Sequence, residues 1–577
     1  MEKKTPRTRL CWWLLGAVFL LAVVLAPGAA ATDLTVDDGN SPYSMTTDLN
    51  NANEYIGTSS SGGVLNQGNS GTYTNTVTTG LRVGLNSGSS GTYNLSGGTL
   101  SGGTGTPSGF ETIGVNTGSS GTFNQTGGLN TIAANNLNLG LDAGSSGTYN
   151  LSAGSLTVSG SSSSSTGYLN VGNSGDGSFS QTGGTAAVAN DINLGYATGA
   201  SGSYTLSDSG SLSAADERIG LDGSGSFTQS GGTNSTTGDV ALGRDAGASG
   251  TYNLTGGSLS VGGNEYSGSH GSGSFTNSGG TDTVTGDLYV GFAPGSSGTY
   301  TLNANGVLAA TYEEIGGSGT GAFTQNGGTN STTGDLSLGR YAGGSGTYNL
   351  NGGSLSVAGN EYSGSLGTGA FTNSGGVNTV TGSLYVGSGT GSSGTYTLSN
   401  TGTLSAASEY IGNFGSGTFT QTGGTNAVSG DLTLSENSKA SGSYNLSGGL
   451  LDPADEYVGY AGTASFTQSG GTNTVTGSLT LGDTSTGSGA YSLSDSGSGS
   501  TLSVGGPEYI GYSGSGTFTQ TGGTHTVTGS LYLGYNSGAS GTYNLSGNGS
   551  LATGYEYVGN SGNGAFTQSG GTHTVAS

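Results

Sequence analysis

The feature that most constrains this chain is a repeat of 48 residues. An aromatic residue in one short motif recurs at a constant step, and a second aromatic residue keeps the same step in the intervening motif. The first series is Tyr204, Tyr252, Tyr300, Tyr348, Tyr396 and Tyr444, and the second is Phe179, Phe227, Phe275, Phe323, Phe371 and Phe419. A fixed period of this length indicates one structural unit that is stacked on itself many times.

Each 48-residue unit is itself double, because its two halves carry related motifs such as LYVG and EYIG, or GTYTLS and GTFTQT. The basic unit is therefore about 24 residues, with three short runs separated by Gly, Ser and Asn. Within Gly298–Asn303, Tyr300 and Leu302 share one side while the polar residues share the other, which is the period of a β-strand. The sequence predicts an all-β fold, a parallel three-faced β-solenoid (β-helix). It has about 22 coils of about 24 residues, arranged as 11 double repeats.

The first 31 residues have the pattern of a secretory signal peptide. Lys3 and Lys4 begin a basic segment, Leu10–Ala26 is apolar, and Ala29–Ala31 fits a cleavage site. An uncleaved membrane anchor is the alternative, because the apolar run is near the lower limit for a membrane span. The repeats begin at Asp33, so we expect residues 1–31 to be removed and residues 32–577 to form one secreted solenoid domain.

Composition and charge limit the kinds of partner that the protein can bind. Glycine accounts for 124 residues and only 7% of residues are charged, which without a period would indicate disorder. Beyond residue 31 the chain has five basic and 32 acidic residues, a net charge of −27. This excess of acid argues against binding to nucleic acid and to anionic membrane surfaces. It suits an extracellular protein.

Stacking turns every repeated position into a column along the solenoid. We expect the Tyr and Phe residues of the two series to alternate within the core and to contribute packing. The residue two places after each Phe is an amide, and we expect these inward amides to bond to one another along the axis. The amide column is Gln181, Gln229, Asn277, Gln325, Asn373, Gln421, Gln468, Gln520 and Gln568.

Acidic residues form two further columns. Because a buried unpaired carboxylate is costly, we expect the glutamates to lie at a corner of the coil. These carboxylates could bind Ca²⁺. The nonapeptide of calcium-binding β-rolls is absent, however, so the pattern favours solvated or turn-capping acids over a calcium site. The candidate metal ligands are Glu265, Glu313, Glu361, Glu409, Asp239, Asp287 and Asp335.

Outward aromatic residues form a stripe that could hold sugars or a neighbouring filament, or could shield the backbone. The stripe is predicted at Tyr266, Tyr362, Tyr410, Tyr457, Tyr509 and Tyr557, with Tyr289, Tyr385 and Tyr532 in the other half-repeat. Outward Thr-x-Thr columns, as at Thr472 and Thr474, resemble those of ice-binding solenoids.

No residue pattern predicts catalysis. Secreted enzymes that use β-helices need long loops with clustered acidic and basic residues. Here His270, His525 and His573 are isolated from triad or metal-ligand spacing. We therefore expect no enzyme activity, no catalytic residues and no cofactor, Ca²⁺ being the one ion left open.

Motifs such as GSGTFTQTGG and GSSGTYNLSGG resemble bacterial secreted glycine-rich β-strand repeat proteins, including autotransporter-passenger-like repeats and β-solenoid repeats of surface proteins. The resemblance covers residues 32–577 and implies a parallel β-solenoid with an extracellular or cell-surface role. We expect a structural protein that associates with itself head to tail into a fibre or matrix. The alternative is a cell-surface adhesin or glycan-binding stalk that contacts polysaccharide or a cell surface. An ice-binding protein and a polysaccharide-degrading β-helix are lesser alternatives.

Overall fold

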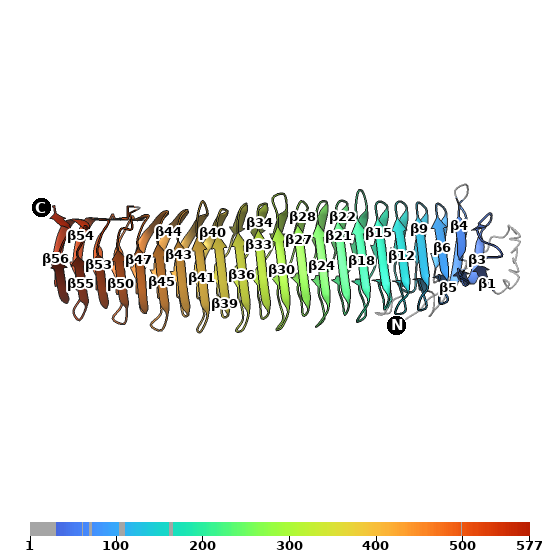
Figure 1. Ribbon diagram of the computed structural model, residues 1–577, viewed down its shortest axis with the longest axis horizontal. Coiled ribbons are helices and arrows are strands. Elements are labelled where there is room, and N and C mark those ends of the chain that lie inside the picture. The colour runs from blue at the N-terminus through green and yellow to red at the C-terminus, as the bar shows by residue number, and fades with distance from the viewer. Residues whose placement is uncertain are drawn as a thin grey trace, which may run out of the picture.

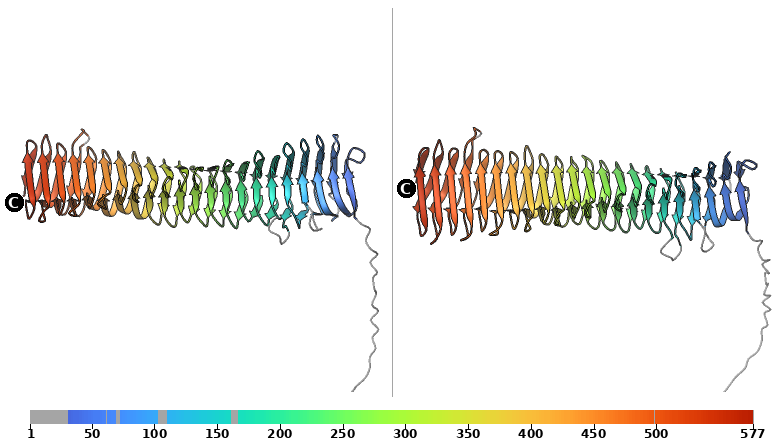
Figure 2. Two further views of the ribbon diagram at one scale, coloured as in Figure 1. Left: turned by 90° about the horizontal axis from the view of Figure 1, so that it is seen from below. Right: turned by 60° about the horizontal axis from the view of Figure 1, so that its bottom comes forward.

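The computed structural model describes residues 31–60, 62–68, 72–102, 110–160, 166–497 and 499–576. Apart from Ala31, the predicted signal peptide therefore lies outside the described residues. The described chain is a long rod of stacked β-strands, with coil after coil in sequence order along its axis (Figures 1 and 2). None of the described residues lies in a helix that is long and apolar enough to cross a membrane.

The solenoid has three faces, and each coil contributes one strand segment to each face. All strand pairings are parallel and join equivalent segments of successive coils. The first face is a separate sheet, whereas the second and third faces are assigned to one 36-stranded sheet because eight long strands run through the corner between them.

The first face contains the strands with the Gly-Thr-Tyr and Gly-Thr-Phe motifs. They are β2 (Tyr43–Ser44), β4 (Gly63–Gln67), β6 (Ser90–Leu95), β9 (Ser120–Gln125), β12 (Ser146–Leu151), β15 (Asp176–Gln181), β18 (Ser201–Leu206), β21 (Ser224–Gln229), β24 (Ser249–Leu254), β27 (Ser272–Asn277), β30 (Ser297–Leu302), β33 (Thr320–Gln325), β36 (Ser345–Leu350), β39 (Thr368–Asn373), β41 (Ser393–Leu398), β43 (Ser416–Gln421), β45 (Ser441–Leu446), β47 (Thr463–Gln468), β50 (Ser488–Leu493), β53 (Ser515–Gln520), β55 (Ser540–Leu545) and β57 (Asn563–Gln568).

The second face consists of short strands with inward Leu, Asn and Val. They are β7 (Thr99–Gly102), β10 (Leu129–Ile132), β13 (Ser155–Val158), β16 (Thr185–Val188), β19 (Ser211–Ala214), β22 (Thr233–Thr236), β25 (Ser258–Val261), β28 (Thr281–Val284), β31 (Val307–Ala310), β34 (Thr329–Thr332), β37 (Ser354–Val357), β48 (Thr472–Val475), β51 (Thr501–Val504) and β58 (Thr572–Val575).

The third face consists mostly of three-residue strands. They are β1 (Thr32–Val36), β8 (Phe110–Ile113), β11 (Leu137–Leu139), β14 (Leu169–Val171), β17 (Ile192–Leu194), β20 (Glu217–Ile219), β23 (Val240–Leu242), β26 (Glu265–Ser267), β29 (Leu288–Val290), β32 (Glu313–Ile315), β35 (Leu336–Leu338), β38 (Glu361–Ser363), β49 (Leu479–Leu481) and β52 (Glu508–Ile510). The strands that span both faces are β3 (Leu49–Ile56), β5 (Thr74–Val83), β40 (Val377–Val386), β42 (Thr403–Ile411), β44 (Thr425–Leu434), β46 (Leu450–Val458), β54 (Thr524–Leu533) and β56 (Ser550–Val558).

The predicted β-solenoid is confirmed. The first face has 22 strands, which matches the predicted number of coils, and about 21 turns connect the first to the last. The register aligns equivalent residues, so that Tyr300 pairs with Phe275 on one side and with Phe323 on the other. Glycine permits the corners: Gly412 has a φ of 75°, and a Cβ there would lie 2.2 Å from the carbonyl oxygen of Ser441.

The predicted aromatic column is also confirmed, as a continuous stack of twenty buried or half-buried rings. Neighbouring ring centroids are 4.6–5.3 Å apart and the rings are nearly parallel. The stack runs through Tyr93, Phe123, Tyr149, Phe179, Tyr204, Phe227, Tyr252, Phe275, Tyr300, Phe323, Tyr348, Phe371, Tyr396, Phe419, Tyr444, Phe466, Tyr491, Phe518, Tyr543 and Phe566. Offset stacking of this kind adds about 0.5–1.5 kcal/mol per pair beyond area burial.

The amide column is inward, as predicted, but its members do not bond to one another. Gln325 alternates along the core with Leu302 and Leu350, so two amides lie two coils apart. Its Oε1 accepts a hydrogen bond from the Tyr348 hydroxyl at 2.6 Å, and its Nε2 donates to the Ser354 carbonyl at 2.9 Å. The prediction of an amide–amide ladder here is therefore wrong, because the half-repeats alternate Gln with Leu.

Candidate functional site

The core contains a column of buried carboxyl groups. Glu313, Glu361 and Glu409 are 0–1% exposed and point inward from the third face. The expected corner location is therefore wrong. It rested on the cost of an unpaired buried carboxylate, whereas each of these three glutamates accepts a hydrogen bond from an asparagine.

Each of these glutamates belongs to a hydrogen-bond network that joins all three faces. Asn378 on the second face donates to Glu361 Oε2 at 2.8 Å and to the Tyr396 hydroxyl at 3.1 Å. The same arrangement repeats at Glu409, Asn426 and Tyr444, whose hydroxyl donates to the glutamine of the preceding coil. Sequence reasoning missed the asparagine, which follows the glutamate by 17 residues in five repeats, those of Glu217, Glu313, Glu361, Glu409 and Glu456.

One repeat lacks both partners. Where the pattern places a glutamate the chain has Leu169, and 17 residues later it has Ala186 in place of asparagine. Both residues are buried, and Tyr204 keeps only its bond to Gln181. The joint replacement indicates that glutamate and asparagine act as one unit, and it could have been found by aligning the repeats.

Burial raises the pKa of these carboxyl groups, because the charged form loses its hydration. The pKa of Glu361 is raised to about 7 and that of Glu409 to about 8, while the asparagine hydrogen bond opposes each rise. Asp282 replaces the asparagine beside Glu265, and burial together with the Asp282 charge raises the pKa of Glu265 well above its usual value. At pH 7, Glu361 is therefore about half protonated and Glu409 is mostly protonated.

Two of the histidines are not isolated, contrary to the sequence prediction. His525 occupies the asparagine position and lies 2.9 Å from the Glu508 carboxylate and 3.0 Å from the Tyr543 hydroxyl. His573 contacts Glu556 in the equivalent way. Both belong to the core network, so their positions indicate a structural role.

The aspartate column lies at the corner that leads into the third face. Asp239 accepts the backbone N–H of Asn264 at 2.8 Å, and Asp335 accepts that of Asn360 at 2.7 Å, which confirms turn capping at these two positions. Asp287 accepts a hydrogen bond from the Tyr289 hydroxyl at 3.0 Å. The candidate ligands Glu265, Glu313, Glu361 and Glu409 lie inside the core, and Asp239, Asp287 and Asp335 lie at the corner. No group of three metal-ligating side chains occurs among the described residues, and Ca²⁺ binding stays a prediction.

The outward tyrosines are confirmed on the third face. Tyr362 stacks on Tyr385 at 5.0 Å, and Tyr385 stacks on Tyr410 at 4.9 Å. Tyr266 and Tyr289 form a similar pair at 4.9 Å. Because these rings cover one another's faces, they present mainly their edges and hydroxyl groups to solvent.

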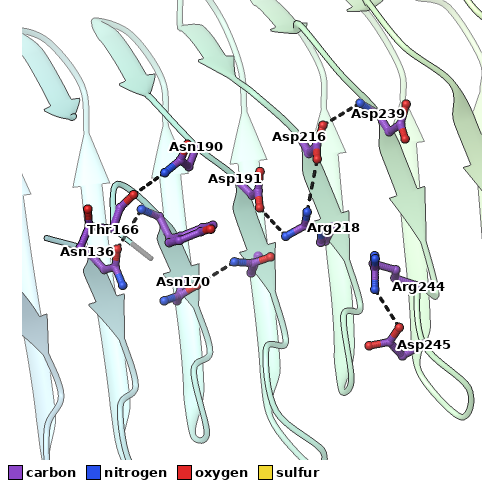
Figure 3. A network of polar contacts seen from close by, with 12 residues as sticks. Asn136, Thr166, Asn170, Asn190, Asp191, Asp216, Arg218, Asp239, Arg244 and Asp245 are labelled. Carbon is purple, nitrogen blue, oxygen red and sulfur yellow. Dashed lines mark hydrogen bonds and ion pairs between the residues drawn. The ribbon is translucent and has the colours of Figure 1, made fainter. Parts of the chain in front are cut away.

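All four arginines within the described residues also lie on or directly beside the third face, at Arg82, Arg218, Arg244 and Arg340. The outward positions of the other two faces are mostly Thr, Ser and Asn. Arg218 lies between Asp191 and Asp216 and pairs with both (Figure 3). The third face therefore concentrates the outward-facing charged and aromatic side chains.

Shallow cavities open around these arginines, and two of them exceed 300 Å³. The first, of about 450 Å³, is lined by Arg218, Arg244, Tyr168 and Tyr196. The second, of about 340 Å³, is lined by Asp287, Tyr289, Tyr312, Glu313, Glu314, Asp335, Arg340 and Tyr341. Sequence reasoning missed both cavities, although each is lined by residues that differ from those of the flanking repeats.

No protein-family model matches the chain, and no curated protein matches its sequence. The resemblance to bacterial glycine-rich repeat proteins therefore remains a prediction from the motifs.

Proposed function

We propose that the protein is a secreted structural subunit that stacks end to end with further copies into an extracellular fibre or matrix. The observation that carries the proposal is the match between the outer edges of the first and last described coils. At the last coil, β57 pairs only with β55, and Val558 and Val575 are 51% and 45% exposed. At the first coil, β2 pairs only with β4.

The edges of the first and last described coils match the alternation of Tyr and Phe half-repeats along the rod. Inside the rod, every Phe of the first face stacks on the Tyr of the next coil. A second copy placed on the last coil would set its Tyr43 over Phe566 and its β1 beside the second half of β56. In the interior, Glu409 pairs with Leu432 at the same position, and Leu34 has the place of that leucine in β1. Parallel strand pairing would then continue across the junction.

The test is electron microscopy of residues 32–577 across a range of protein concentrations. We expect unbranched filaments of the width of one solenoid. The double variant Phe566→Asp and Val575→Asp should give single rods with an unchanged circular dichroism spectrum, whereas Thr567→Asp on the outward side of β57 should leave the filaments intact. Single rods of the unmodified chain at every concentration would refute end-to-end stacking.

A cell-surface adhesin or glycan-binding stalk is the second candidate function. The observation that favours it is the concentration of arginine and tyrosine on one face, since a plain rod has no need of different faces. Single rods that bind polysaccharide would support this candidate over the fibre.

A further inference from the structure

The cavity beside Arg340 is lined by residues that differ from those of the flanking repeats. At the corner position before the third-face strand, which varies along the chain, the flanking repeats have Asn264 and Asn360, and this one has Tyr312, as two distant repeats have Tyr168 and Tyr555. Asn264 accepts the Asp287 N–H at 2.9 Å through its side chain, and Asn360 does the same for the next coil. A tyrosine has no side-chain carbonyl for the Asp335 N–H, so this ladder is interrupted at Tyr312.

Two further differences from the flanking repeats lie at the same place. Glu314 stands where these repeats carry the outward Tyr266 and Tyr362. Arg340 stands at a variable position, which holds Phe292 in the repeat before and Ser388 in the repeat after. The Arg340 Nε lies 3.3 Å from Glu314 Oε2. Since the solenoid accepts the ordinary residues at these positions in other repeats, its fold does not require the replacements.

Tyr312 forms a flat aromatic surface. A Cβ added to Gly334 would lie 2.3 Å from Cε1, 2.6 Å from Cδ1 and 2.7 Å from Cζ of Tyr312. Similar distances to three adjacent ring atoms mean that the glycine lies against the face of the ring rather than its edge. The residue is nevertheless 44% exposed, so the opposite ring face is open to solvent. This differs from the stacked tyrosines, whose faces cover one another.

The rim of the cavity provides hydrogen-bonding groups of both kinds. The guanidinium of Arg340 is a donor, and its side chain is 46% exposed. Asp287 and Asp335 provide carboxylate acceptors, and Tyr341 is 44% exposed. An open ring face with planar donors and acceptors around it suits a ligand that has an apolar flat side and many hydroxyl groups.

We propose that this face of the solenoid binds an uncharged polysaccharide chain, with one sugar ring on Tyr312 and its hydroxyl groups bound by Arg340 and the neighbouring carboxylates. Charge decides between glycan classes, because the chain has a formal net charge of −24 and the cavity itself has more acids than arginines. An anionic polysaccharide would be repelled. This proposal does not depend on end-to-end stacking.

The second arginine cluster extends the site along the rod. Arg244 stands at the position of Arg340 two double repeats earlier, which is four coils or roughly 19 Å along the axis. Its cavity is lined by Arg218 and by Tyr196, which is 43% exposed. Figure 3 shows Arg218 and Arg244 on neighbouring coils. A linear polymer that follows the axis would contact both cavities, which a single small sugar could not do.

Affinity electrophoresis tests the proposal. The probes are hydroxyethyl cellulose and galactomannan as uncharged polymers and alginate as an anionic one, each cast into a native gel. The assembly-blocked Phe566→Asp, Val575→Asp protein is used so that failure to stack cannot affect the result. We expect retardation by at least one uncharged polymer and none by alginate.

The variants Tyr312→Asn and Arg340→Ser restore residues that other repeats carry, so both should fold. Each should weaken binding at least about fivefold, as expected for loss of an aromatic or charged contact. The matched control is Tyr410→Thr, on the same face four coils away, which should bind as the parent does. The proposal is overturned if neither uncharged polymer retards the protein, if alginate binds more strongly, or if Tyr312→Asn binds like the control. A protein ligand at this face would give the first of these results.

Discussion

The buried glutamates predict that the solenoid is less stable in mild alkali than in mild acid. The pKa of Glu361 is raised from 4.5 to about 7 and that of Glu409 to about 8, because burial disfavours the carboxylate. The same groups ionise near pH 4.5 in the unfolded chain. Between these values the folded state holds more protons than the unfolded state, so the free energy of unfolding falls as pH rises. The contribution of these two groups should level off well below pH 4.5 and again well above pH 8.

The magnitude follows from linkage. A pKa that rises from 4.5 to about 7 removes about 3 kcal/mol of stability across this range for Glu361, and the larger rise at Glu409 removes up to about 5 kcal/mol. Both groups are fully buried, so solvent screening does not reduce these figures. The chain also contains the neutral form of the unit, Leu169 with Ala186. The double variant Glu361→Leu, Asn378→Ala removes the same two polar partners and should recover up to about 3 kcal/mol of the loss, less the cost of the Tyr396 hydroxyl, which loses its bond to Asn378.

The assay is urea denaturation at pH 5, 7 and 9, followed by circular dichroism. Hydrogen exchange of the amides in β38 and β40 is measured alongside, because a long repeat array need not unfold in one step. The matched control is Tyr362→Thr, next to Glu361 but on the outward side. Equal or greater stability of the parent at pH 9 would refute the reasoning, since the carboxyl groups would then be ionised within the fold. So would a double variant with the parent's pH dependence.

Three further substitutions test the core and the corners. Asn378→Leu alone should lower the free energy of unfolding by about 1–3 kcal/mol, because Glu361 and the Tyr396 hydroxyl lose their shared hydrogen-bond donor. Urea denaturation at pH 7 measures this loss. An unchanged free energy of unfolding would mean that water replaces the amide. Phe371→Ala should lower the free energy of unfolding by about 3–5 kcal/mol, because it opens a cavity in the ring stack. Urea denaturation measures this loss as well, and Thr372→Ala, on the outward side of the same strand, is the control. Gly412→Ala should lower the melting temperature, because φ is 75° and a carbonyl oxygen lies where its Cβ would be; an unchanged value would show that the corner can relax.

The fold could be predicted because one pattern determines it at every level. The 48-residue step fixes the stacking, and the alternation of Tyr300 and Leu302 with threonine fixes which side faces the core. The register then follows, since any slip by one residue would turn the aromatic rings outward. A binding site cannot be predicted in this way, because it needs only a few residues and no repeated pattern marks them.

The glutamate column was placed incorrectly for a physical reason. The corner prediction considered the cost of burying a carboxylate alone and did not include the asparagine that donates a hydrogen bond to it. Asn378 lies 17 residues after Glu361 and on a different face, so no local pattern joins the two. Only the geometry of the coil brings them to 2.8 Å. Alignment of the repeats would have supplied the missing signal, because Leu169 and Ala186 replace the two partners together.

Comparison between repeats also indicates that the third face carries the binding site. The positions of Tyr312 and Arg340 vary between repeats, and other coils fold with Asn360 and Ser388 there, so the fold does not require a tyrosine or an arginine at these places. A departure that also gives up a backbone hydrogen bond, as Tyr312 does, makes the solenoid less regular and brings it no compensating contact in the core. Glu314 and Arg340 line the same cavity as Tyr312, and a shared ligand would explain why these three groups meet there. Restoring the ordinary residues should therefore leave the rod as stable or more stable, while it loses the binding of the polysaccharide.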